Sequence, residues 1–133
     1  MNGASSAKKY YSRTNNADLN LANLPPPGLV SIFHRISGGL LFFPGLPALL
    51  YLLHTALRTP QDFERVRGYL GSGLAKLVIV GLVWLYAHHF FAGIRYLLLD
   101  LHLGIEKIPA RQSAIVVLAL GVATALICAW RIW

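Results

Sequence analysis

Two adjacent histidines, His88 and His89, lie inside a long apolar run in the second half of the chain. Ionisable residues are rare in sequence that lipid could surround, and they usually face a protein interior or a cofactor. At 3.6 residues per turn, one helix face carries His89, Gly93, Tyr96 and Asp100. An imidazole followed one turn later by a glycine is compatible with a flat ligand, and a haem with His89 as axial ligand fits this pattern. Alternatively, both histidines bond backbone carbonyls of neighbouring helices.

A second polar pair, Ser31 and Arg35, lies near the start of the first apolar run. One helical turn separates the two residues, so their side chains can converge on one group. A hydroxyl and a fixed array of N–H donors at the membrane interface could hold a carbonyl-bearing apolar molecule such as a quinone. The alternative is an arginine that reaches for lipid phosphate and a serine that caps the helix. His34, between them, has the same spacing to Gly38 as His89 has to Gly93.

The composition indicates a membrane protein. The chain has 133 residues, of which 56% are hydrophobic and only 13% are charged, whereas soluble domains are nearer 45–50% apolar and about 25% charged. A formal charge of +7 could suggest nucleic-acid binding, but the basic residues are scattered at the ends of apolar runs rather than gathered in a patch. The single cysteine, Cys128, excludes a disulfide within the chain and an iron–sulfur cluster built by this chain alone.

The order of polar and apolar stretches predicts two parts. Residues 1–28 form a polar, proline-rich tail, and Pro25–Gly28 is expected to be extended and non-helical. Residues 29–133 form an all-α membrane domain of three transmembrane helices, belonging to a heteromeric helix bundle. The expected spans are residues 36–57, 70–99 and 113–133, with charged loops between them. Pro44 and Pro47 can kink the first span without ending it.

The distribution of basic residues predicts the orientation. Seven lysines and arginines fall on the side of the N-terminus and the second loop, against five on the other side, which places the N-terminus in the cytoplasm. Ser31, Arg35 and Arg95 then meet at the same membrane face. His89 lies eleven residues before Asp100, about 16 Å deeper at 1.5 Å per residue and therefore near the middle of the bilayer.

Two sequence motifs, by their order and separation, resemble those of the cytochrome b subunits of succinate dehydrogenase. They are Ser31-Ile-Phe-His34-Arg35-Ile-Ser-Gly38 and His89-Phe-Phe-Ala-Gly93-Ile-Arg95 followed by Asp100. Each motif is weak alone, and the resemblance extends from about Pro25 to the C-terminus. It implies a membrane anchor of complex II, in electron transport of the tricarboxylic acid cycle, located in a bacterial inner membrane.

The resemblance also implies cofactors and partners. Haem b would lie between this chain and a second membrane anchor, with His89 as this chain's axial ligand and a histidine of the partner opposite. Ser31 and Arg35 would contribute to the ubiquinone site, and His34 and Arg95 match positions near the haem propionates. The flavoprotein and iron–sulfur subunits would dock on the cytoplasmic face, and succinate itself would be oxidised there rather than by this chain.

Two departures from the family pattern and two rival functions remain open. Tyr96 stands where many relatives have histidine, and a phenol can hydrogen-bond a propionate but cannot carry a positive charge. His88 is additional and points about 100° away from His89 on a helix, which makes it a rival haem ligand. The rival functions are a fumarate reductase anchor, which has the same architecture, and a haem-free structural membrane subunit.

Overall fold

The structure, a computed structural model, describes residues 24–133, and the predicted polar tail lies mostly outside this range. Every element within the described part is helical: α1 Pro26–Leu40, a π-helical turn η4 Leu41–Gly45, α2 Leu46–Ala56, α3 Pro60–Leu70, α4 Gly73–Asp100 and α5 Lys107–Ile132. Helices α1, η4 and α2 are continuous, so they form one span, Pro26–Ala56. With α4 and α5 this makes three helices long and apolar enough to cross a membrane. The predicted all-α fold with three spans is confirmed.

The first helix begins within the proline cluster. Pro25 is extended and serves as the N-cap, whereas Pro26 and Pro27 occupy the first helical turn. The expectation that the backbone stays extended through Gly28 was therefore wrong. Proline suits the first turn of a helix because its fixed φ is helical and the N–H that it lacks would have no intrahelical partner there.

The prolines in the first span change its helical geometry without ending it. Pro44 lies inside η4, and Pro47 lies in the first turn of α2. A proline has no N–H to offer and its ring crowds the preceding turn, so a wider π-helical turn relieves the strain. The span continues as α2, as the sequence predicted.

The segment between the first two spans is a helix rather than a charged loop. Thr59 caps α3 by accepting a hydrogen bond from the backbone N–H of Asp62 at 3.1 Å. Asp62 also pairs with Arg65 one turn later, at 3.3 Å. A side-chain cap followed by charged residues at helical spacing stabilises a short helix, although the segment is too polar to span a membrane.

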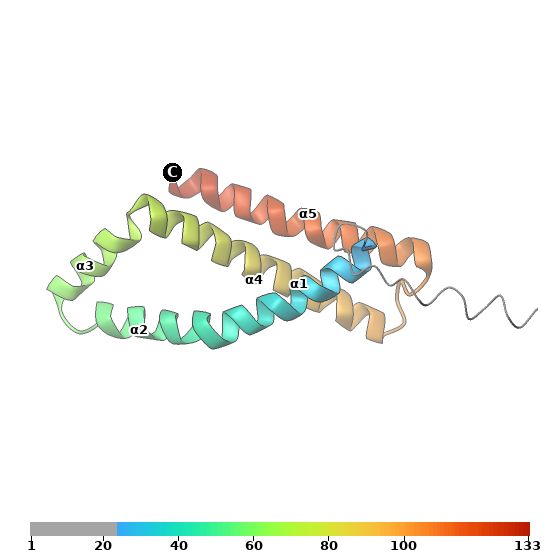
Figure 1. Cartoon of the computed structure of the whole chain (residues 1–133), viewed down its shortest axis with the longest axis horizontal. Coiled ribbons are helices and arrows are strands. Elements are labelled where there is room, and N and C mark those ends of the chain that lie inside the picture. The colour runs from blue at the N-terminus through green and yellow to red at the C-terminus, as the bar shows by residue number, and fades with distance from the viewer. Residues whose placement is uncertain (1–23) are drawn as a thin grey trace, which may run out of the picture.

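The helices are arranged as a tight pair crossed by the first span (Figure 1). Helices α4 and α5 run side by side along their length, and α1 packs on both of them at the end of the bundle that holds the segment between α4 and α5. Beyond η4, α2 packs mainly on η4 and α3 and diverges from the α4–α5 pair. The core lies where α1 meets the pair and consists of Val30, Ala92, Ala114 and Val117.

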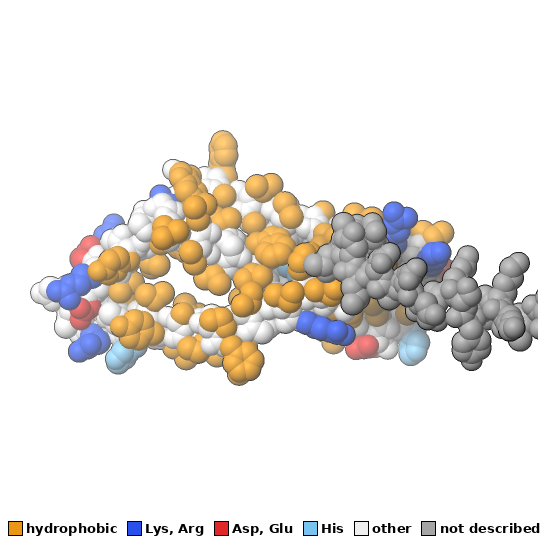
Figure 2. Space-filling model, in the orientation of Figure 1, with side chains coloured by type: hydrophobic (Ala, Val, Ile, Leu, Met, Phe, Trp, Pro, Cys, Tyr) orange, Lys and Arg blue, Asp and Glu red, His pale blue; other side chains and the backbone are white. Residues whose placement is uncertain are grey.

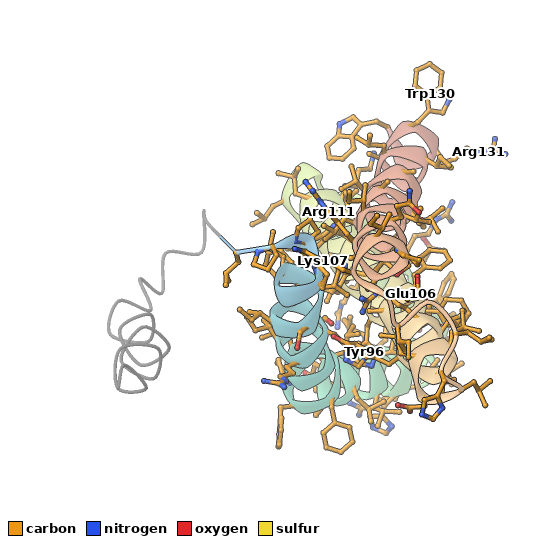
Figure 3. The ribbon with its side chains drawn as sticks, turned by 90° about the vertical axis from the view of Figure 1, so that its right-hand side faces the viewer. Tyr96, Glu106, Lys107, Arg111, Trp130 and Arg131 are labelled. Atoms are coloured by element: carbon orange, nitrogen blue, oxygen red, sulfur yellow. The ribbon has the colours of Figure 1, made fainter. Side chains whose placement is uncertain are left out.

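The outer surface suits a bilayer. Apolar side chains cover the middle of the molecule, whereas lysines and arginines lie near its two ends (Figure 2). Trp130 and Arg131 project outward from the end of α5 (Figure 3). The ammonium of Lys76 lies 5.6 Å from the centre of the Trp133 ring. Tryptophan with cationic side chains at a helix end is typical of a membrane interface.

Candidate functional site

Two histidines from different spans meet where α1 crosses α4. The rings of His34 and His89 are stacked, with centroids 4.3 Å apart and planes inclined by 12°. The ring of Tyr96 lies 5.1 Å from that of His34, and Figure 3 shows Tyr96 between α1 and the other two spans. The structure thus brings together three of the residues that the sequence singled out.

The hydrogen bonds around His89 indicate which ring nitrogen carries the proton in the neutral imidazole. Its Nδ1 lies 3.1 Å from the backbone oxygen of His34 and 3.2 Å from the Oγ of Ser37. A carbonyl oxygen can only accept, so Nδ1 carries the proton and donates it. The hydroxyl of Ser37 in turn donates to the same carbonyl at 3.0 Å. In a neutral imidazole this arrangement leaves the lone pair on Nε2, as required of a metal ligand.

A glycine on α1 makes room for the His89 ring. A Cβ placed on Gly38 would lie only 2.9 Å from Cε1 of His89, whereas one on Gly39 would meet nothing within 4 Å. A Cβ on Gly93 of α4 would lie 3.9 Å from Nε2 of His34, an ordinary contact. Of these three glycines, Gly38 is therefore the one at which an added methyl group would collide with the His89 ring.

His88 occupies a different environment. It is completely buried and packs against the rings of Phe33 and Trp84 with centroid separations of 5.8 Å. Across the interface, a Cβ on Gly121 of α5 would lie 3.5 Å from the backbone of His88. The Val30 carbonyl is close, but neither ring nitrogen of His88 makes a well-aligned hydrogen bond. The three spans therefore enclose this imidazole, and its surroundings differ from those of His89.

Arg95 extends toward α5 rather than toward the histidine pair. Its Nε donates to Oγ of Ser113 at 3.0 Å, and its Nη2 donates to the carbonyl of Ala110 at 3.2 Å. The guanidinium also lies 5.6 Å from the centre of the Tyr96 ring. The structure therefore does not bring Arg95 together with His34 and His89.

Ser31 and Arg35 lie one turn apart on α1, on either side of His34 in the sequence. Ser31 is half-buried and Arg35 is exposed. Within residues 24–133, Arg35 forms no ion pair, so its donors remain available to a ligand or to lipid. Because Ser31 lies in the interior of α1, five residues after the helix begins, it does not cap the helix.

Ser37 is the site residue that sequence reasoning missed. It is buried and contacts both histidines through hydrogen bonds. Its position three residues after His34 was a usable signal, since residues at that spacing are neighbours on a helix surface. Without knowledge of how α1 crosses α4, however, a serine beside two glycines also fits simple close packing.

The donor set of this chain suits a haem iron better than an ion held by side chains alone. Among the described residues no three histidine, cysteine or carboxylate side chains cluster to hold a metal. A haem iron takes its equatorial ligands from the porphyrin and needs only axial ligands from protein. One imidazole whose Nδ1–H is bonded to a carbonyl meets that requirement.

Known proteins resemble this chain over most of its length. The model of the succinate dehydrogenase/fumarate reductase transmembrane subunit family matches residues 9–128. The chain is 35% identical to the succinate dehydrogenase cytochrome b556 subunit of Coxiella burnetii, over 89% of this chain and 94% of that protein. It is 28% identical to the protein of the same name from Paracoccus denitrificans, over 82% and 83% of the two chains. With three apolar spans as well, the chain belongs to the family of succinate dehydrogenase/fumarate reductase transmembrane subunits.

Proposed function

We propose that this chain is the cytochrome b anchor of a succinate:ubiquinone oxidoreductase, holding haem b through His89 and forming part of the site where quinone is reduced. The observation that supports haem binding most directly is the bond from Nδ1 of His89 to the carbonyl of His34, at 3.1 Å. It fixes the ring orientation and leaves Nε2 as the basic nitrogen. The names of both relatives include a b-type cytochrome.

Each residue of the proposed haem site has a distinct role. Nε2 of His89 would bind the iron, and Ser37 and the His34 carbonyl would orient the imidazole. The imidazole of His34 and the phenol of Tyr96 supply polar groups beside it. Arg95 is left out of these contacts because two of its nitrogens are bonded to α5. When bound, haem b would supply one-electron storage within the membrane.

For quinone we propose Ser31 and Arg35 as this chain's contribution. Both lie within one turn of His34, and Arg35 is free of ion pairs with other described residues. A hydroxyl and a guanidinium can together hold a carbonyl oxygen of ubiquinone and stabilise negative charge that develops there during reduction. Further contacts would come from the second anchor and the iron–sulfur subunit.

The proposed orientation places this end of the bundle in the cytoplasm of a bacterial inner membrane. Electrons would arrive from the flavoprotein and iron–sulfur subunits docked there. The support is the excess of basic residues on that side of the sequence. Reduction of quinone near Ser31 and Arg35 would then occur close to the soluble donor.

A reduced-minus-oxidised spectrum of the purified membrane complex tests the proposal. We expect a b-type band that is lost or shifted in His89→Ala and retained in His54→Ala, a control at an exposed histidine on α2. A complex without haem would leave this chain as a structural anchor, and a band that is identical in both variants would show that His89 is not the ligand. Succinate-driven reduction of ubiquinone in the same preparation distinguishes the succinate direction from fumarate reduction.

A further inference from the structure

A long groove runs between α4 and α5, separate from the histidine pair. Its volume is about 510 Å³, and its lining residues come from α4, α5 and the segment between them. Most of them are apolar, among them Phe91, Leu98, Val116 and Leu120. Because no residue of α1 lines it, the groove is independent of the crossing at which His34 and His89 meet.

The polar groups in this groove are Arg95 and Ser113. Arg95 is only 5% exposed, and within the described part of the chain it pairs with no carboxylate. Its bonds to Ser113 and Ala110 use Nε and Nη2, whereas a guanidinium has five N–H donors. A buried charge that is bonded only to neutral oxygens is costly in an apolar setting, so an anionic partner would be strongly favoured.

The position of the groove limits what can enter it. Arg95 lies five residues before the end of α4, about 7–8 Å along the helix axis, which is the depth at which lipid headgroups meet acyl chains. Leu103 and Gly104 of the connecting segment line the groove at the end nearest to the aqueous phase. Val116, which lines the side of the groove, is 54% exposed. A ligand therefore enters most easily from the bilayer.

We propose that this groove binds a phospholipid, with one acyl chain along the apolar lining and a phosphate oxygen accepting hydrogen bonds from Arg95. A phosphate balances the guanidinium charge, and charge-assisted hydrogen bonds are the strong ones. A neutral quinone offers carbonyl oxygens but leaves the charge uncompensated. Binding of the lipid does not depend on haem or on the quinone site.

The test uses the whole complex in nanodiscs of phosphatidylcholine that contain a phosphatidylglycerol with a photoactivatable group in mid-chain. In the wild type we expect cross-links to concentrate on the groove faces of α4 and α5. Val116→Trp fills the groove, so labelling there should fall to the level of other lipid-facing surfaces. Val122→Trp is the matched control, since this valine is on the same helix, is 49% exposed and lies outside the groove; it should retain wild-type labelling.

A second variant tests the charge. In Arg95→Gln, retention of phosphatidylglycerol through detergent washing should fall about ten-fold, the scale of one lost charge-assisted hydrogen bond. Equal groove labelling in Val116→Trp and Val122→Trp, or displacement of the label by ubiquinone but not by unlabelled phospholipid, overturns the proposal. The b-type spectrum and quinone reduction, measured on the same samples, show separately whether the proposed haem and quinone functions hold.

Discussion

The imidazole of His34 stacks on that of His89 across the α1–α4 interface, with the ring centroids 4.3 Å apart. The same two residues are joined a second time, by the bond from Nδ1 of His89 to the carbonyl of His34. Two contacts of different kinds restrain both the position and the rotation of the His89 ring. The proposed role of His89 as a haem ligand requires such a restrained ring with a free Nε2.

Gly38→Ala should damage haem binding. Its new Cβ would lie 2.9 Å from Cε1 of His89, so the ring or α1 must move. We expect haem content per complex to fall by about ten-fold or more, the range found when the groups that orient a metal ligand are disturbed. Haem extraction and the difference spectrum provide the measurement.

Gly39→Ala is the control for that variant, because a Cβ at Gly39 meets nothing within 4 Å. It makes the same chemical change on the neighbouring residue of the same helix. It should retain full haem content, since alanine also favours helix over glycine. Equal haem loss in both variants would show that helix α1 tolerates no added methyl, and that the contact with His89 has no special role.

Ser37→Ala should weaken haem binding without abolishing it. The variant loses the hydroxyl at 3.2 Å from Nδ1 of His89 but keeps the carbonyl of His34. We expect up to about a ten-fold loss of haem affinity together with a shifted midpoint potential. Redox titration of the b-type band is the measurement. Thr55→Ala, which removes a hydroxyl bonded only to the preceding turn of its own helix, should leave the potential unchanged.

Substitutions at His88 and His89 should affect different properties, stability in the first case and haem binding in the second. His88→Ala empties a fully buried position among three spans, and large-to-small changes at such positions cost about 2–5 kcal/mol. Its melting temperature should therefore drop while the b-type spectrum persists. His89→Ala should instead lose or shift the b-type spectrum while the melting temperature changes little. Loss of the spectrum in His88→Ala, in a complex that still assembles, would reverse the assignment of the ligand.

Arg35→Lys and Ser31→Ala should reduce quinone more slowly while still delivering electrons from succinate to an artificial dye. Lysine retains the charge but not the planar donor array, so the expected loss in quinone reduction is about ten-fold, equivalent to about 1.4 kcal/mol. Arg111→Lys, at an exposed arginine near the start of α5, is the control. If both variants reduce quinone at the wild-type rate, the site lies elsewhere.

The sequence predicted what depends on local pattern and missed what depends on how helices cross. Three apolar runs are long enough to span a bilayer, and the special position of His89 follows from helical spacing. The partnership of Ser37 with His89 joins residues 52 positions apart, which no local pattern reveals. The direction of Arg95 likewise depends on where Ser113 and Ala110 of α5 fall.

The π-helical turn at Leu41–Gly45 divides the first span into two halves that pack against different elements. A π-turn contains one residue more than the α-helical turn it replaces. The residues that follow it are therefore rotated about the helix axis relative to an uninterrupted α-helix. The half before it is held in register by His34, Ser37 and Gly38 against α4. The half after it packs mainly on η4 and α3. Deleting a residue within the turn would consequently rotate α2 by about 100° about its axis while leaving the histidine pair in place.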